Sequence, residues 1–108
     1  MSTARALIHL PAAIERGSVF EIRTTIAHPM ETGHRRDSAG VLLPRDVVTR
    51  FECRLDGVLV FAADLHPAIA ANPYLAFTLR AERPGELSFL WEGDRGFRHQ
   101  ETRRLAFA

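Results

Sequence analysis

The sequence predicts an all-β protein, an immunoglobulin-like antiparallel β-sandwich of about seven strands. Apolar and polar residues alternate strongly along most of the chain, while the 3.6-residue period of helices is weak throughout. Turn residues divide the alternating segments into short runs whose spacing is typical of sandwiches and barrels. The length of 108 residues suits one domain. We therefore expect residues 1–108 to form a single sandwich.

The clearest strand signal is a hairpin in the middle of the chain. Phe51, Cys53 and Leu55 lie on one face of an alternating segment whose other face is charged. Asp56 and Gly57 follow directly, and this pair favours the positive φ angles of a two-residue hairpin turn. The next segment is then the returning strand. In chain order, the expected strands are residues 6–10, 17–27, 47–55, 58–64, 74–81, 86–92 and 97–105.

The second half of the chain shows the same pattern. Asn72-Pro73 is a turn signal immediately before an alternating segment, because Asn tolerates positive φ and Pro fixes its own φ. Leu87, Phe89 and Trp91 then alternate with polar residues and are expected to point inward. The final strand, 97–105, is polar enough to be an edge strand or a largely solvated one.

The segment 27–46 departs from this alternation. It contains two prolines, two glycines and the charged run His34–Asp37, so we expect a long loop. Long ordered loops in compact domains tend to carry function.

Composition narrows the classes of partner. The net charge is +1, and all fourteen basic residues are arginine. Nucleic acids and anionic membranes usually bind a concentrated basic patch, so neither is expected here. The N-terminal residues have no apolar run of the length of a signal peptide. On these facts alone the expected compartment is cytoplasmic.

Cys53 is the single cysteine of the chain. It lies in the middle of an expected strand, in phase with Phe51 and Leu55, so we expect it to be buried as a small apolar side chain. A reactive or carrier thiol needs exposure and an electropositive setting instead. Ser18, Ser38 and Ser88 lie in no recognisable nucleophile motif either, so we expect no catalytic residue in this chain.

An alternative hypothesis is a small metal-binding redox or hydrolytic domain. His28, Glu31 and His34 have a metal-like spacing, His-x-x-Glu-x-x-His. Pro29 and Gly33 argue against a helix that would bring these side chains to one face. We therefore expect no metal and no cofactor.

Four segments resemble the SoxZ family, the Z subunit of the Sox sulfur-oxidation carrier complex. The similarity runs in colinear order from about Gly17 to the last strand, and the most specific part is the His-Pro-Met-Glu-Thr-Gly loop followed by Asn-Pro-Tyr. The segments that carry the resemblance are His28–Gly33, Leu43–Arg45, Phe61–Leu65 and Ala71–Phe77.

The resemblance implies a subunit without a catalytic role that pairs with a SoxY-like subunit as a heterodimer. In that family, a cysteine on the C-terminal arm of SoxY carries sulfur intermediates during thiosulfate oxidation, and the complex meets Sox sulfur-processing enzymes transiently. The resemblance also implies periplasmic localisation by co-export with the partner, without a signal peptide of its own. When isolated, the subunit is expected to form a homodimer through its exposed apolar sheet face.

We expect partner binding at two places, the loop that starts at His28 together with Arg45, and the Asn-Pro-Tyr turn. Aromatic and arginine side chains are enriched at interfaces, which favours this choice. Two alternatives remain: these residues brace the ends of the sandwich, or the chain is a general adhesion or substrate-binding module. The residues expected to bind a partner are His28, Pro29, Met30, Glu31, Thr32, Gly33, Arg45, Asn72, Pro73 and Tyr74.

Overall fold

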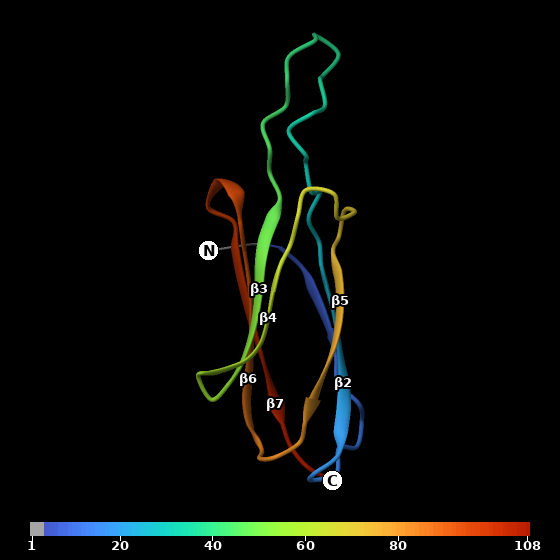
Figure 1. Ribbon diagram of the computed structural model, residues 1–108, viewed down its shortest axis with the longest axis vertical. Coiled ribbons are helices and arrows are strands. Elements are labelled where there is room, and N and C mark those ends of the chain that lie inside the picture. The colour runs from blue at the N-terminus through green and yellow to red at the C-terminus, as the bar shows by residue number, and fades with distance from the viewer. Residues whose placement is uncertain (1–3) are drawn as a thin grey trace.

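Two antiparallel sheets face each other in a computed structural model that describes residues 4–108 (Figure 1). One sheet has the strand order β1-β2-β5 and the other β4-β3-β6-β7. This arrangement confirms the predicted all-β, immunoglobulin-like sandwich. Within the four-stranded sheet, β4 pairs with β3. The strands are β1 (Ala6–His9), β2 (Val19–Ile26), β3 (Val48–Leu55), β4 (Val58–Asp64), β5 (Tyr74–Arg80), β6 (Gly85–Gly93) and β7 (Arg98–Leu105).

The connections confirm the predicted turns. Asp56 and Gly57 join β3 to β4 with φ angles of 47° and 84°. A two-residue hairpin turn of this kind needs positive φ at both positions, and Asp and Gly adopt it readily. Between β6 and β7 the chain makes a short 3₁₀ turn, η1 (Asp94–Gly96). Residues 4–108 contain no helical segment that could span a bilayer.

Phe51 lies at the centre of the core between the sheets. Its ring centroid is 5.7 Å from that of Phe77 in the opposite sheet and 5.2 Å from that of Trp91 on the neighbouring strand. Phe61 and Phe89 complete the cluster at 6.1 and 6.4 Å. Aromatic rings at these separations pack favourably in addition to burying apolar area.

The start of β3 differs from simple alternation. Val47, directly before the strand, is fully buried. Val48 is fully buried as well, because the pairing of β3 with β6 shifts register between Val48 and Arg50. The extra residue at this shift is Thr49, so the alternation that places Phe51 inward is displaced by one residue and Val48 points inward too.

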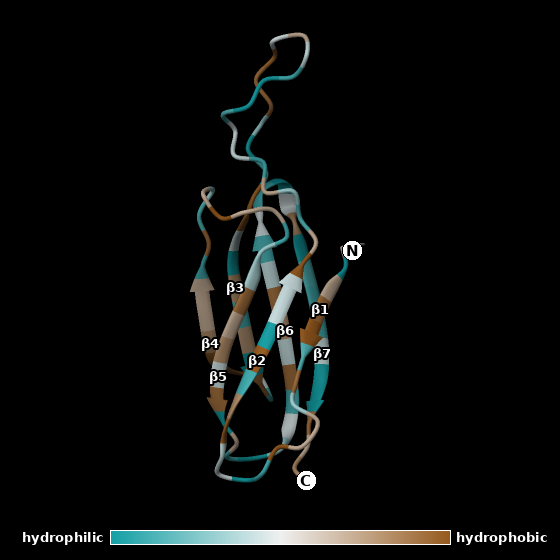
Figure 2. Cartoon of the chain, turned by 90° about the vertical axis from the view of Figure 1, so that its right-hand side faces the viewer, coloured by the Kyte–Doolittle hydropathy of each residue, from teal (hydrophilic) through white to brown (hydrophobic). Residues whose placement is uncertain are grey.

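The two edges of the sandwich differ in chemistry (Figure 2). Phe61 of β4 stacks on Phe77 of β5 with centroids 4.2 Å apart, so these edge strands of opposite sheets face each other. On the other edge strand, β7, the residues paired with Trp91, Phe89 and Leu87 are His99, Glu101 and Arg103. The predicted position of the last strand at an edge is confirmed.

The molecule is 56 Å long and only 22 and 19 Å across. Much of this length comes from residues 31–46, which project beyond the strands as a two-stranded loop (Figure 1). We call this segment the arm. The expected long loop is therefore an extended structure that leaves the sandwich.

The central position of Phe51 leads to a stability prediction. Phe51→Ala should lower the free energy of unfolding by about 3–5 kcal/mol, because it removes buried area and leaves a cavity between the sheets. Val19→Ala, at a side chain that is 55% exposed, should change it by less than about 0.5 kcal/mol. Urea denaturation followed by tryptophan fluorescence measures both. Equal losses in the two variants would contradict this account of the core.

Candidate docking site at the arm and its base

The arm is a ladder of main-chain hydrogen bonds with few contacts to the sheets. At its base, Glu31 and Asp46 each donate an N–H to the other's carbonyl oxygen at 2.8 Å. Farther out, Leu43 N–H donates to Arg35 O at 2.8 Å. At the tip, Asp37 Oδ1 accepts the N–H of Ala39 at 2.9 Å. An isolated two-stranded ladder has marginal stability, so the position of the arm depends on its base.

His28 is the central side chain of that base and is 5% exposed. Its Nδ1 accepts the Met30 N–H at 3.0 Å. The proton of the neutral ring therefore sits on Nε2, which faces Asp46 Oδ1 at 3.5 Å. The ring also makes an edge contact with Phe97, with centroids 4.7 Å apart. Because both ring nitrogens face protein atoms, His28 acts as a bracing residue in this structure.

Asn72 connects the two segments in which partner binding was predicted. Its N–H donates to His28 O at 2.7 Å, and its side-chain Oδ1 accepts the His28 N–H at 2.9 Å. Asn72 has a φ of 54°, in the left-handed region that Asn tolerates better than most residues. The predicted loop and the predicted turn therefore lie together at one end of the sandwich.

Met30 and Gly33 make the arm base compact. Met30 is 4% exposed, and its Sδ accepts the Val48 N–H at 3.2 Å beside the register shift of β3. Gly33 has a φ of 87°, and a Cβ there would lie 3.0 Å from Arg45 Cβ. A larger residue at position 33 would therefore be strained and would press against the facing chain.

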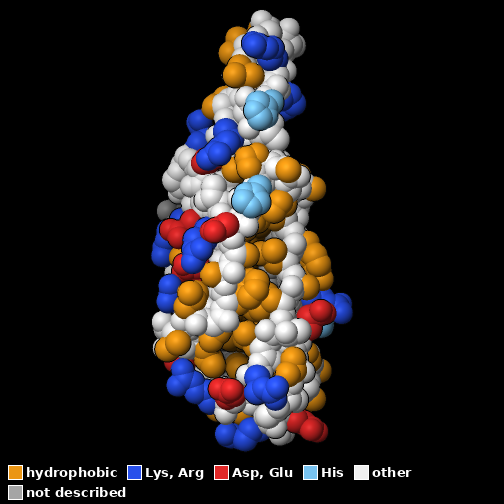
Figure 3. All heavy atoms as spheres, in the orientation of Figure 1, with side chains coloured by type: hydrophobic (Ala, Val, Ile, Leu, Met, Phe, Trp, Pro, Cys, Tyr) orange, Lys and Arg blue, Asp and Glu red, His pale blue; other side chains and the backbone are white. Residues whose placement is uncertain are grey.

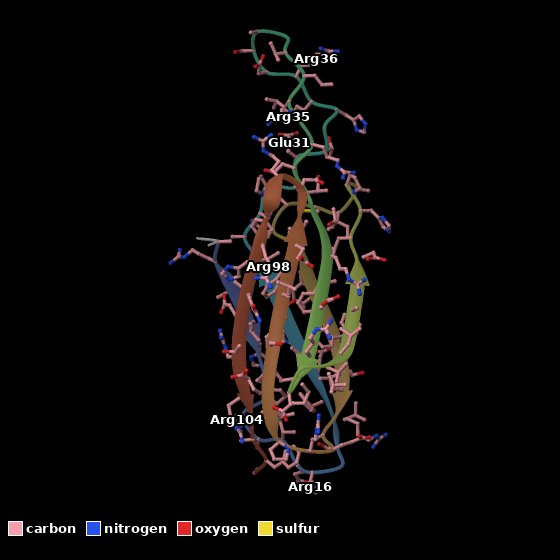
Figure 4. The ribbon with its side chains drawn as sticks, turned by 90° about the vertical axis from the view of Figure 1, so that its left-hand side faces the viewer. Arg16, Glu31, Arg35, Arg36, Arg98 and Arg104 are labelled. Atoms are coloured by element: carbon pink, nitrogen blue, oxygen red, sulfur yellow. The ribbon has the colours of Figure 1, made fainter. Side chains whose placement is uncertain are left out.

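Two ion pairs order the polar side of the arm. Arg45 donates two hydrogen bonds to Asp94, each of 2.8 Å, and ties the arm to η1. These bonds hold the pKa of the Asp94 carboxyl below its ordinary value. Arg35 reaches Glu31 Oε1 at 2.6 Å and lowers the pKa of that carboxyl in the same way (Figure 4).

The ten predicted partner-binding residues differ in their exposure to solvent. His28, Met30 and Pro73 are buried, whereas Pro29 and Tyr74 have exposed side chains. Glu31, Thr32 and Gly33 are partly buried, and Asn72 and Arg45 are exposed but bonded within the base. The structure places all ten around one feature and shows bracing contacts for about half of them.

Sequence reasoning did not single out several exposed apolar side chains. On the arm, Val41 and Leu42 are 60% and 48% exposed. On the three-stranded sheet, Leu7 is 74% exposed and lies across Thr25 from Tyr74, the predicted partner-binding residue that is 58% exposed. The signal was the Val41-Leu42-Leu43 run inside a loop otherwise rich in glycine and charge.

The donor set of the metal hypothesis does not form in the described residues. Among residues 4–108 no group of three or more His, Cys, Asp or Glu side chains could hold a metal ion. His28 faces Asp46 and Met30, while Glu31 is paired with Arg35. His34 is exposed on the arm.

Cys53 is fully buried, as predicted. Burial raises the pKa of its thiol to about 12. At neutral pH the sulfur is therefore protonated and shielded from solvent, which is the state of an unreactive cysteine.

Comparison with known proteins gives one family and one fold. The family model described as "Sulphur oxidation protein SoxZ" matches residues 8–104. Comparison with curated protein sequences yields no significant match.

Solved structures resemble the chain in fold at low sequence identity. A superoxide reductase (neelaredoxin) from Ignicoccus hospitalis is 15% identical over 95% of this chain and 80% of its own, with a TM-score of 0.70. A putative superoxide reductase from Thermotoga maritima is 13% identical over 95% and 85%, with a TM-score of 0.70. The sulfur carrier protein SoxY from Chlorobium limicola f thiosulfatophilum is 17% identical over 95% and 74%, with a TM-score of 0.64.

The Asn72 brace can be tested by substitution. Asn72→Ala should lower the free energy of unfolding by about 1–2 kcal/mol, because the His28 N–H loses its acceptor. Asn72→Asp keeps an acceptor oxygen at the same place and should lose less. Chemical denaturation measures both variants. The brace would be refuted if the aspartate variant were as unstable as the alanine variant.

The buried state of Cys53 predicts slow thiol labelling. In native protein, Ellman's reagent should react only as fast as the sandwich opens, and in guanidinium it should react at once. A control chain carrying Cys53→Ser and Val19→Cys has one exposed thiol and should react immediately in both conditions. Rapid labelling of native wild-type protein would show that the sulfur is accessible.

Proposed function

The chain belongs to the SoxZ family of sulphur oxidation proteins, and we propose that it works as the non-catalytic subunit of a periplasmic sulfur-carrier complex. In this proposal it forms a heterodimer with a SoxY-like subunit. The C-terminal cysteine of that partner carries the sulfur intermediates during thiosulfate oxidation, and the complex contacts Sox sulfur-processing enzymes transiently.

The burial of Cys53 is the observation that carries this proposal. Covalent sulfur transfer through a protein thiol needs a thiolate that can reach a reactant. Cys53 is the chain's single cysteine, it is fully buried, and its pKa is raised to about 12. A sulfur-oxidation subunit with such a cysteine depends on another chain for the carrier thiol.

The surfaces described above support a role in recognition. The arm is braced at its base and exposes Val41 and Leu42, which are side chains suited to contact with a second protein. The similarity in fold to SoxY makes a pair of like sandwiches a reasonable architecture for the complex.

The periplasm is proposed on the basis of family membership. The chain's cysteine usage is compatible with an oxidising compartment, because a single buried thiol neither forms an intrachain disulfide nor meets oxidants readily.

Co-expression with a SoxY subunit tests the proposal. We expect the two chains to co-purify as a 1:1 complex whose intact masses show sulfur adducts on SoxY and none on this chain. A Cys53→Ser variant should behave in the same way, because the thiol has no part in carriage. Failure to bind SoxY, or sulfur adducts on Cys53, would contradict the proposed function.

A further inference from the structure

The β4–β5 edge of the sandwich exposes an uncharged apolar strip, which we call the seam. Val58, Leu59 and Val60 of β4 are 58%, 43% and 37% exposed. Half-buried Phe61, together with Leu75 and Leu79 of β5, lies beside them. Figure 3 shows hydrophobic side chains gathered along this edge and continuing onto the arm.

A bulge explains why three consecutive side chains of β4 are exposed. The partners of Cys53 and Arg54 are Phe61 and Leu59, so Val60 is an extra residue that interrupts the alternation. A bulge also disturbs main-chain pairing along a free strand edge. A partner is therefore expected to contact this part of β4 through side chains and not by adding a strand.

The other edge strand of the four-stranded sheet, β7, differs from β4 because it has charged side chains on its inward side. Along β7, His99, Glu101 and Arg103 are linked at 2.8 and 3.1 Å on the inward side. Inward-pointing charges protect an edge strand against association. Between Val58 and Ala63, β4 contains no charged residue, so an apolar surface can cover it without burying an unpaired charge.

The size of the seam indicates that the arm belongs to the same surface. Seven residues of β4 span about 23 Å, and with the 19 Å narrow dimension they cover roughly 440 Å². A stable interface needs about 800 Å² from each partner. The β4 part of the seam falls short of this area, so the surface has to extend along the 56 Å length of the molecule onto the arm.

We infer that the seam and the arm form one docking surface for the SoxY-like subunit, which packs an uncharged face of its own sandwich against β4 and β5 while Val41 and Leu42 reach over its end. This inference rests on the proposed function for the identity of the partner. The occupant is a folded sandwich because the surface is long, uncharged along β4 and bulged against strand addition.

The test measures the affinity of SoxY for four forms of the full chain. Val58→Glu changes the seam and Leu42→Glu changes the arm. Val19→Glu is the matched control, because Val19 is also a strand valine with similar exposure, at 55%, but lies on β2. We expect the first two variants to bind at least about tenfold more weakly, and the control to bind like wild type within about twofold. Circular dichroism and denaturation midpoints would show that all four forms are folded.

The outcomes separate this inference from the proposed function. Wild-type binding with unaffected Val58→Glu and Leu42→Glu variants would overturn the docking surface and leave the SoxY pairing intact. Equal weakening by Val19→Glu would overturn it as well. If the wild-type chain does not bind SoxY but self-associates through Val58, the surface is a contact with a second copy of the chain. That result would refute both proposals.

Discussion

The packing of aromatic rings around Phe51 is the interaction on which the rest of the structure depends. It joins β3 to β6 within one sheet and to β5 across the sandwich, so the spacing between the sheets follows from it. Cys53 lies two residues away on the same face and is buried for the same reason. The state of the thiol is therefore a consequence of the packing that holds the two layers together.

Most of the fold could be predicted because strand signals are local. Alternation and turn residues located all seven strands to within a few residues, and Asp56-Gly57 gave the hairpin its turn. The exposed run in β4 could not be predicted, because a bulge at Val60 breaks the two-residue period without a glycine to mark it. The inward polar side chains of β7 also escape a pattern argument, because Glu101 is bonded to both His99 and Arg103.

The candidate site was predictable in position but not in the roles of its residues. Motifs at His28–Gly33 and Asn72–Tyr74 are separated by about 40 residues, and nothing local shows that His28 and Asn72 exchange two hydrogen bonds. The motif residues His28 and Met30 are buried and support the arm. The side chains that the arm exposes are those of Val41 and Leu42, which belong to no predicted motif. Distinguishing support from contact required the side-chain geometry.

The extra residue at Val60 has a consequence for behaviour at high concentration. A flat, uncharged strand edge would let copies add to one another without limit, as cross-β fibrils grow. The bulge at Val60 interrupts the regular strand edge that such growth would need. The apolar side chains of Val58, Leu59 and Val60 nevertheless stay exposed. The chain can therefore expose these apolar side chains without offering a regular strand edge to which further copies could add.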